Sequence, residues 1–132
     1  MSKGRKLFLI HWNLAEAEEL ARKFEGAGWQ VEVEAEDGGQ AYQRMKTAPA
    51  DILVIYLNRL PSHGRETAHA VRSYKATSHL PIIFVGGQGE ALEKTKTKIP
   101  EAIYTTEADV LAVLNQYQNR SGQEIYHGDG LR

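Results

Sequence analysis

The chain has 132 residues, of which 42% are hydrophobic and 25% charged, and its formal net charge at pH 7 is −1. This length suits one domain with its own core, and the small net charge argues against binding to nucleic acid or to an anionic membrane. The absence of cysteine excludes disulfides, thiol catalysis and thiolate metal sites. Near the start only residues 7–10 are continuously apolar, which is too short for a signal peptide or a membrane span, so a cytoplasmic protein is expected.

The first third of the chain predicts a strand, a helix and a second strand. Residues 7–10 are typical of a strand buried on both faces. Asn13 is a suitable N-cap for a helix whose apolar residues recur at helical spacing, namely Leu14, Ala17, Leu20, Ala21 and Phe24. Residues 29–35 alternate apolar and polar side chains, which predicts a half-exposed strand whose outward face carries Gln30, Glu32 and Glu34.

The middle of the chain continues this alternation. A turn at residues 37–39 leads into a short predicted helix that carries Ala41, Tyr42 and Met45. Residues 52–56 form the next buried strand. After a loop over residues 58–64, a helix is expected over residues 65–75, with its inward face formed by Ala68, Val71 and Tyr74.

The last third predicts two more strands and two more helices. The strands are expected over residues 80–85 and 102–104, and a lysine-bearing helix over residues 90–98 lies between them. Thr105 or Thr106 is expected to cap a last helix whose apolar stripe contains Val110, Leu111, Val113, Leu114 and Tyr117.

Strand and helix therefore alternate five times with short connections. Such a pattern favours an α/β fold, in which a five-stranded parallel sheet is covered by helices on both faces, as in flavodoxin-like (βα)5 proteins. We place this domain over residues 6–117 and interpret residues 118–132 as a polar, flexible C-terminal tail.

In an open parallel sheet, ligands bind beyond the carboxyl ends of the strands, where the strand order reverses. The residues that end or follow the predicted strands are therefore candidates for a binding site. The candidates are His11, Trp12 and Asn13 after the first strand, Tyr56 at the end of the third, Gly86 after the fourth, and Thr106 or Glu107 after the fifth.

Taken together, these features resemble the receiver domain of two-component response regulators, the CheY-like family, over nearly the whole domain. The resemblance is carried by the five β/α units, by Asn58 and Pro61 after the third strand, and by Gly64 at the expected start of the third helix. The separations from Trp12 to Tyr56 and from Tyr56 to Gly86 are also close to those of the family.

The resemblance implies a phosphorylation pocket, and this chain lacks each of its residues. The family uses an acidic pair to hold Mg²⁺, an aspartate to accept the phosphoryl group, a threonine or serine hydroxyl, and a lysine. Here the corresponding positions hold His11 and Trp12, then Tyr56, Gly86, and Thr106 or Glu107. A phenol has no carboxylate with which to form an acyl phosphate. We therefore expect a degenerate pseudo-receiver with no catalytic residue, no metal and no cofactor.

The resemblance also implies a function in signal transduction through protein binding, without phosphorylation and without enzymatic activity. The expected partner is a protein, such as a histidine kinase or another regulator of a phosphorelay. In the resembled family the helix-4, strand-5, helix-5 face makes dimer and output contacts. The corresponding residues here are Lys94, Lys96, Lys98, Tyr104 and Asp109, which we regard as a candidate surface for a partner or a homodimer.

The alternative is a sensor that uses the altered crevice for a small molecule, a nucleotide or a metal ion. An open pocket between Trp12, Tyr56 and Gly86 would favour it, and a sealed pocket would oppose it. We expect the ring of Tyr56 to plug the vacated pocket, with Trp12 packed beside it. His11 and His63, with Glu107 or Asn13, are the candidate metal ligands.

Two further alternatives have less support. The Gly86-Gly87-Gln88-Gly89 segment follows a strand but lacks the G-x-G-x-x-G order of nucleotide-binding loops. No catalytic triad or pair of carboxylates can be assembled at the strand ends, so an enzyme ranks last. The chain is also compatible with being a domain of a longer protein.

Overall fold

The computed structural model describes residues 5–36, 40, 43–45, 50–58 and 61–117. They form a parallel sheet of five strands in the order β2-β1-β3-β4-β5. The strands are β1 (Lys6–Ile10), β2 (Gln30–Glu34), β3 (Ile52–Tyr56), β4 (Ile82–Val85) and β5 (Ile103–Thr105). The predicted flavodoxin-like α/β architecture is confirmed.

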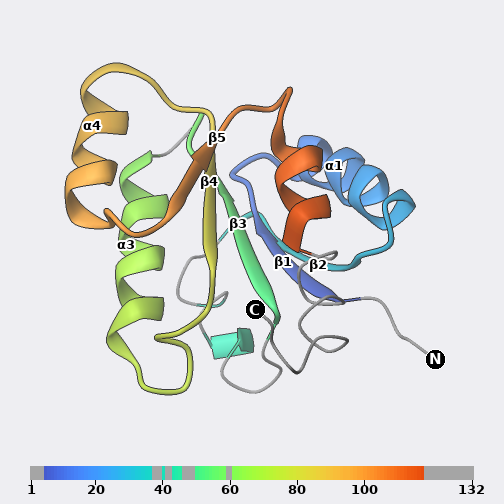
Figure 1. Ribbon diagram of the computed structural model, residues 1–132, viewed down its shortest axis with the longest axis horizontal. Helices are drawn as coiled ribbons and strands as arrows, with labels where there is room; N and C mark the ends of the chain where they lie inside the picture. The colour runs from blue at the N-terminus through green and yellow to red at the C-terminus, as the bar shows by residue number, and fades with distance from the viewer. Residues whose placement is uncertain (1–4, 37–39, 41–42, 46–49, 59–60, 118–132) are drawn as a thin grey trace, which may run out of the picture.

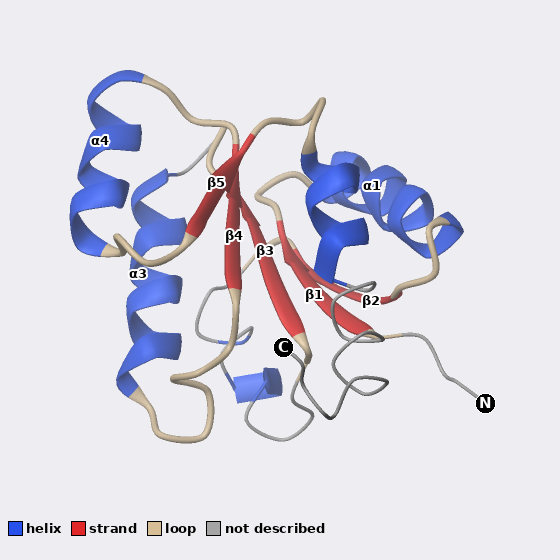
Figure 2. Ribbon diagram, in the orientation of Figure 1, coloured by secondary structure: helices blue, strands red, loops and turns tan. Residues whose placement is uncertain are grey.

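Helices cover both faces of the sheet (Figure 1). They are α1 (Leu14–Gly26), α3 (Pro61–Ser73) and α4 (Gly89–Lys98), together with the helical residues 110–117. As Figure 2 shows, α3 and α4 lie on one side of the sheet, and α1 and the helix of residues 110–117 lie on the other. The predicted turn at residues 37–39, Ala41, Tyr42 and the tail 118–132 lie outside the described residues, whereas Met45 is helical and buried.

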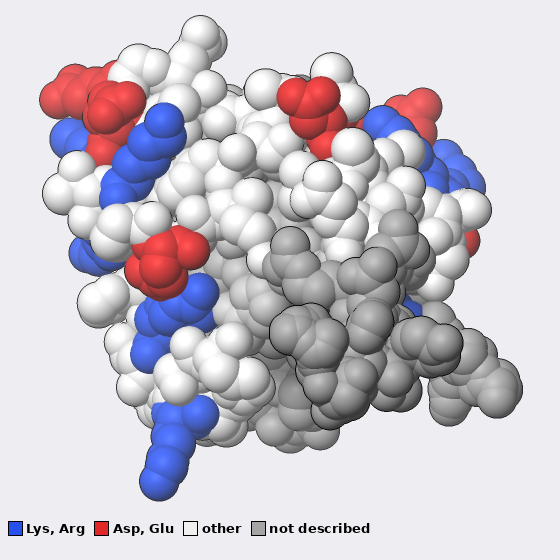
Figure 3. Space-filling view, viewed as in Figure 1, with Lys and Arg blue, Asp and Glu red and all other residues white. Residues whose placement is uncertain are grey.

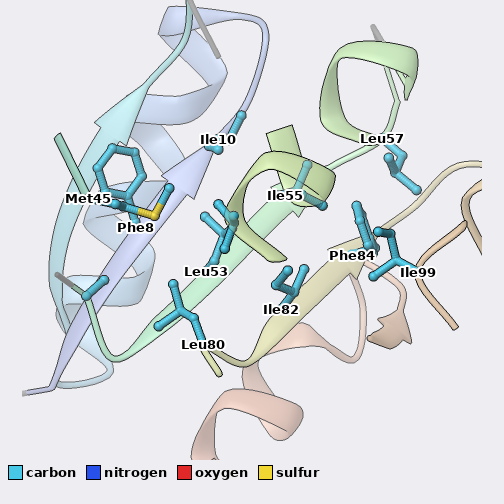
Figure 4. Close-up of a cluster of buried hydrophobic side chains, with 13 residues drawn as sticks. Phe8, Ile10, Met45, Leu53, Ile55, Leu57, Leu80, Ile82, Phe84 and Ile99 are labelled. Atoms are coloured by element: carbon cyan, nitrogen blue, oxygen red, sulfur yellow. The ribbon is translucent and has the colours of Figure 1, made fainter. Parts of the chain in front are cut away.

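Each face of the sheet packs against its helices in a separate apolar cluster. On the α3 and α4 side the largest members include Phe8, Leu53, Ile55 and Phe84 (Figure 4). On the α1 side, Leu7, Leu9 and Val54 pack with Phe24 and Leu114, among others. All five residues of β3 and all four of β4 are buried, which explains why these strands are continuous apolar runs in the sequence.

The ends of the helices follow from local capping and close packing. The Asn13 side chain accepts a hydrogen bond from the backbone N–H of Glu16 at 2.9 Å, so the predicted N-cap of α1 is confirmed. Thr106, and not Thr105, accepts the backbone N–H of Asp109 at 3.2 Å ahead of the last helix. Gly64 lies inside α3, where an added Cβ would approach Ile55 Cγ2 to 2.9 Å, so glycine lets this helix lie close to β3.

Two predictions about side-chain direction are wrong. Tyr74 lies beyond the end of α3 and is 50% exposed, because the helix begins and ends earlier than the apolar spacing indicated. Glu34 is buried although the alternation placed it outward. Its carboxylate is paired with Arg44 at 2.7 Å, and this pairing is why a charged side chain is tolerated there.

Candidate functional site

The strand order reverses between β1 and β3, and a crevice of about 920 Å³ opens beyond the carboxyl ends of these strands. Five of the residues selected from the sequence line it, namely His11, Tyr56, Gly86, Thr106 and Glu107. The crevice is therefore open, as a ligand sensor would require, but it is lined differently from the pocket that the sequence predicted.

Tyr56 and Glu107 form the central contact of the crevice. The Tyr56 hydroxyl donates a hydrogen bond to Glu107 Oε1 at 2.6 Å. The other oxygen of this carboxylate, Oε2, accepts a hydrogen bond from Lys23 Nζ at 3.0 Å. Burial and, after it, the hydrogen bond to Glu107 raise the pKa of Tyr56 well above its usual value. The phenol therefore stays protonated at neutral pH and acts as a donor.

His11 lies beside Tyr56 on the floor of the crevice. The two rings stack with centroids 4.9 Å apart and planes inclined by 29°. His11 is 4% exposed, and its Nε2 lies 3.3 Å from Glu16 Oε1 of α1. Stacked aromatic rings therefore occupy the strand ends at which the resembled family places carboxylates.

Gly86 directly follows β4 and has a backbone that disfavours a side chain. Its φ is +79°, in the left-handed region, and an added Cβ would meet Asn58 Oδ1 at 2.2 Å. The Gly86 N–H donates to the carbonyl of Thr105 at 3.1 Å, which links the ends of β4 and β5. A threonine or serine hydroxyl at this position would require both the loop and Asn58 to move.

Trp12 and Asn13 are not among the residues that line the crevice. The Trp12 ring packs edge-on against His63, with centroids 5.5 Å apart, and against the apolar cluster on the α3 and α4 side. The prediction that Trp12 packs beside Tyr56 is wrong, because consecutive residues after β1 turn to opposite faces of the sheet. Asn13 is used to cap α1.

The residues that the sequence analysis missed come mostly from α1. Glu16, Glu19, Leu20 and Lys23 line the crevice from this helix. They recur at intervals of three and four, so they lie on one helical face. This spacing was available in the sequence, but the site candidates were taken only from the residues at the strand ends.

The described residues contain no group of three or more histidine, aspartate or glutamate side chains that could hold a metal ion. His11 contacts Tyr56 while His63 contacts Trp12, so the histidines proposed as a metal pair lie in different environments. The crevice thus presents hydrogen-bond donors, carboxylates and apolar walls, and no carboxylate ends β3.

The candidate interaction residues lie on and around α4. Lys94, Lys96 and Lys98 are exposed on this helix, and so is Asp109 ahead of the last helix. The Tyr104 hydroxyl donates to the carbonyls of Thr95 at 3.0 Å and Ile99 at 2.7 Å, which joins β5 to the end of α4. Charges of both signs alternate over α3 and α4, without a large patch of one sign on the visible face (Figure 3).

No protein-family model matches the sequence, and no curated protein matches it. Solved structures do resemble its fold. The chemotaxis protein CheY4 of Vibrio cholerae superposes with a TM-score of 0.70 at 18% identity, covering 89% of this chain and 98% of CheY4. A LuxR-family response regulator from Aurantimonas sp. SI85-9A1 superposes with a TM-score of 0.69 at 24% identity, over 86% of this chain and 81% of that one.

A CheY-like receiver domain from Methylobacillus flagellatus gives a TM-score of 0.67 at 18% identity, over 86% of this chain and 98% of its own. These likenesses establish that the chain has the fold of CheY-like receiver domains. Separately, none of the helices within the described ranges combines the length and the apolar character needed to cross a bilayer.

Proposed function

We propose that this chain is a receiver-like module of signal transduction that acts by binding another protein, without aspartyl phosphorylation and without catalysis. The observation that carries the proposal is the end of β3, where a protonated phenol bonded to Glu107 replaces a nucleophilic carboxylate. Gly86 supports it, because no hydroxyl is present there to contact a phosphoryl oxygen.

The face around α4 and β5 is the proposed binding surface. Lys96 is exposed and its Nζ lies 5.7 Å from the centroid of the Tyr104 ring, so a cation and a half-buried aromatic lie side by side. Aromatic side chains are enriched at protein interfaces, and a cation over a ring face adds a favourable contact. A histidine kinase or another regulator, or a second copy of the chain, is the expected partner.

The test uses the full chain as bait and compares Lys96→Glu with Lys75→Glu, which reverses another exposed lysine outside α4. We expect a partner that is retained by the wild type and the Lys75 variant and lost by the Lys96 variant, with no effect of acetyl phosphate and Mg²⁺. A partner retained equally by all three, or only after acetyl phosphate treatment, would contradict the proposal.

The open crevice favours a second candidate function, a sensor of a small molecule. Its volume of about 920 Å³ is within the usual range of ligand sites, and it combines the partly exposed apolar side chain of Leu20 with a few polar groups. A screen of small organic molecules by thermal shift tests it. The sensor candidate predicts saturable stabilisation by at least one class, whereas the binding module alone predicts none.

A further inference from the structure

The carboxylate of Glu107, whose side chain is 52% exposed, is contacted in the crevice by two donors at once. Its two oxygens are contacted by different donors, Tyr56 from β3 and Lys23 from α1, at 2.6 and 3.0 Å. Tyr56 is only 4% exposed, so its hydroxyl is a fixed donor at the base of the site. One neutral donor and one cation on the two oxygens is a complementary arrangement for a monoanion.

We propose that Tyr56 and Lys23 form a carboxylate-binding site, that the chain's own Glu107 occupies this site, and that small monocarboxylic acids with an apolar body compete with it. Leu20, which is partly exposed, supplies apolar surface in the same crevice. An external acid can therefore reproduce both hydrogen bonds and add buried apolar contact, which Glu107 does not provide.

The other charges of the crevice select against more highly charged anions. Glu16 and Glu19 also line it, and the carboxylate of Glu16 lies 3.3 Å from His11 Nε2. Two carboxylates near the site repel a phosphate dianion or a dicarboxylate more strongly than a monoanion. The ligand class is therefore a monocarboxylate.

Competition with Glu107 also gives the site a structural consequence. A tethered group acts at an effective concentration of roughly millimolar or higher. To displace Glu107, an external acid must therefore be present above this concentration or bind more tightly through apolar contact. Glu107 lies in the turn between β5 and the helix of residues 110–117, where Thr106 accepts the N–H of Asp109. Displacing Glu107 would release this turn from both β3 and α1. Carboxylate binding in the crevice does not depend on whether the α4 and β5 face binds a partner.

The direct test removes the internal ligand and supplies acetate in its place. In Glu107→Ala, sodium acetate at ten times its Kd is expected to raise the melting temperature by about 3–5 °C relative to sodium chloride of equal ionic strength. The matched control is Glu101→Ala, which removes a carboxylate from the Arg72 ion pair elsewhere on the surface. Acetate is expected to leave this control and the double variant Tyr56→Phe, Glu107→Ala unchanged.

Equal stabilisation of all three variants, or of none, would overturn the proposal. A second measurement needs no destabilising substitution. Butyrate added to the labelled wild type is expected to shift the amide resonances of Leu20, Tyr56 and Val85 in a saturable way, whereas butylammonium is not. Absence of these shifts, or identical shifts with both compounds, would also contradict a carboxylate site.

Discussion

At the scale of single residues, the two partly or fully buried tyrosines Tyr56 and Tyr104 give the chain a pH dependence. Burial and then the charge of Glu101 raise the pKa of Tyr104 to about 12, and the pKa of Tyr56 is raised as well. An unfolded tyrosine ionises near pH 10. Above this pH the unfolded chain loses protons that the folded chain keeps, so the folded state loses stability as pH rises.

We therefore predict that the free energy of unfolding is at its full value below about pH 10 and falls as the pH rises from about 10 through about 12. Urea denaturation at a series of alkaline pH values measures this free energy. Tyr104→Phe is expected to reduce the slope of the unfolding free energy against pH. Tyr74→Phe, which removes the hydroxyl of a tyrosine that is 50% exposed, provides the comparison. If neither substitution changes the slope of the unfolding free energy against pH, groups other than these tyrosines cause the loss of stability.

At the scale of secondary-structure elements, the edge strand β2 depends on Arg44. This side chain contacts Glu32 at 2.6 Å, Glu34 at 2.7 Å and the carbonyl of Val33 at 3.1 Å, and its guanidinium carbon lies 5.2 Å from the Phe8 ring centroid. It thereby joins the helical residues 43–45 to two strands.

Arg44→Met is predicted to lower the free energy of unfolding by about 2 kcal/mol, because it leaves the carboxylate of Glu34 buried without its main partner. This is below the cost for a fully buried pair, since the Arg44 side chain is 37% exposed. Lys94→Met removes an exposed pair with Glu90 and is expected to cost less than about 0.5 kcal/mol. Urea denaturation compares the two, and equal costs would contradict the role given to Arg44.

The order and type of the described elements were predictable because the central strands are buried on both faces. A continuous apolar run such as Ile52–Tyr56, with helical patterns before and after it, indicates a strand that is buried on both faces of a parallel sheet. The ends of elements were less predictable, as Tyr74 shows, since apolar spacing continues past the last helical turn of α3. Glu34 was misplaced because the paired cation, Arg44, approaches from another element.

At the scale of the whole molecule, a receiver-like fold is retained while the residues at its strand ends differ from those of the resembled family. The sequence predicted which strand ends meet, because parallel strands share one carboxyl edge. It did not predict that Glu107 reaches Tyr56 or that Lys23 joins them from α1, since those contacts depend on how α1 packs on the sheet. Trp12 and His11 could not be distinguished either, because the turn after β1 sets their directions.

We propose above all that this crevice does not accept a phosphoryl group on β3. The most direct measurement is an amide-correlation NMR spectrum of the labelled chain, titrated with Mg²⁺ and then with beryllofluoride, which mimics a phosphoryl group. We expect unchanged resonances for His11, Tyr56 and Gly86, because no carboxylate ends β3 to bind either species. Saturable shifts clustered at these three residues would contradict it and would identify the crevice as an ion site.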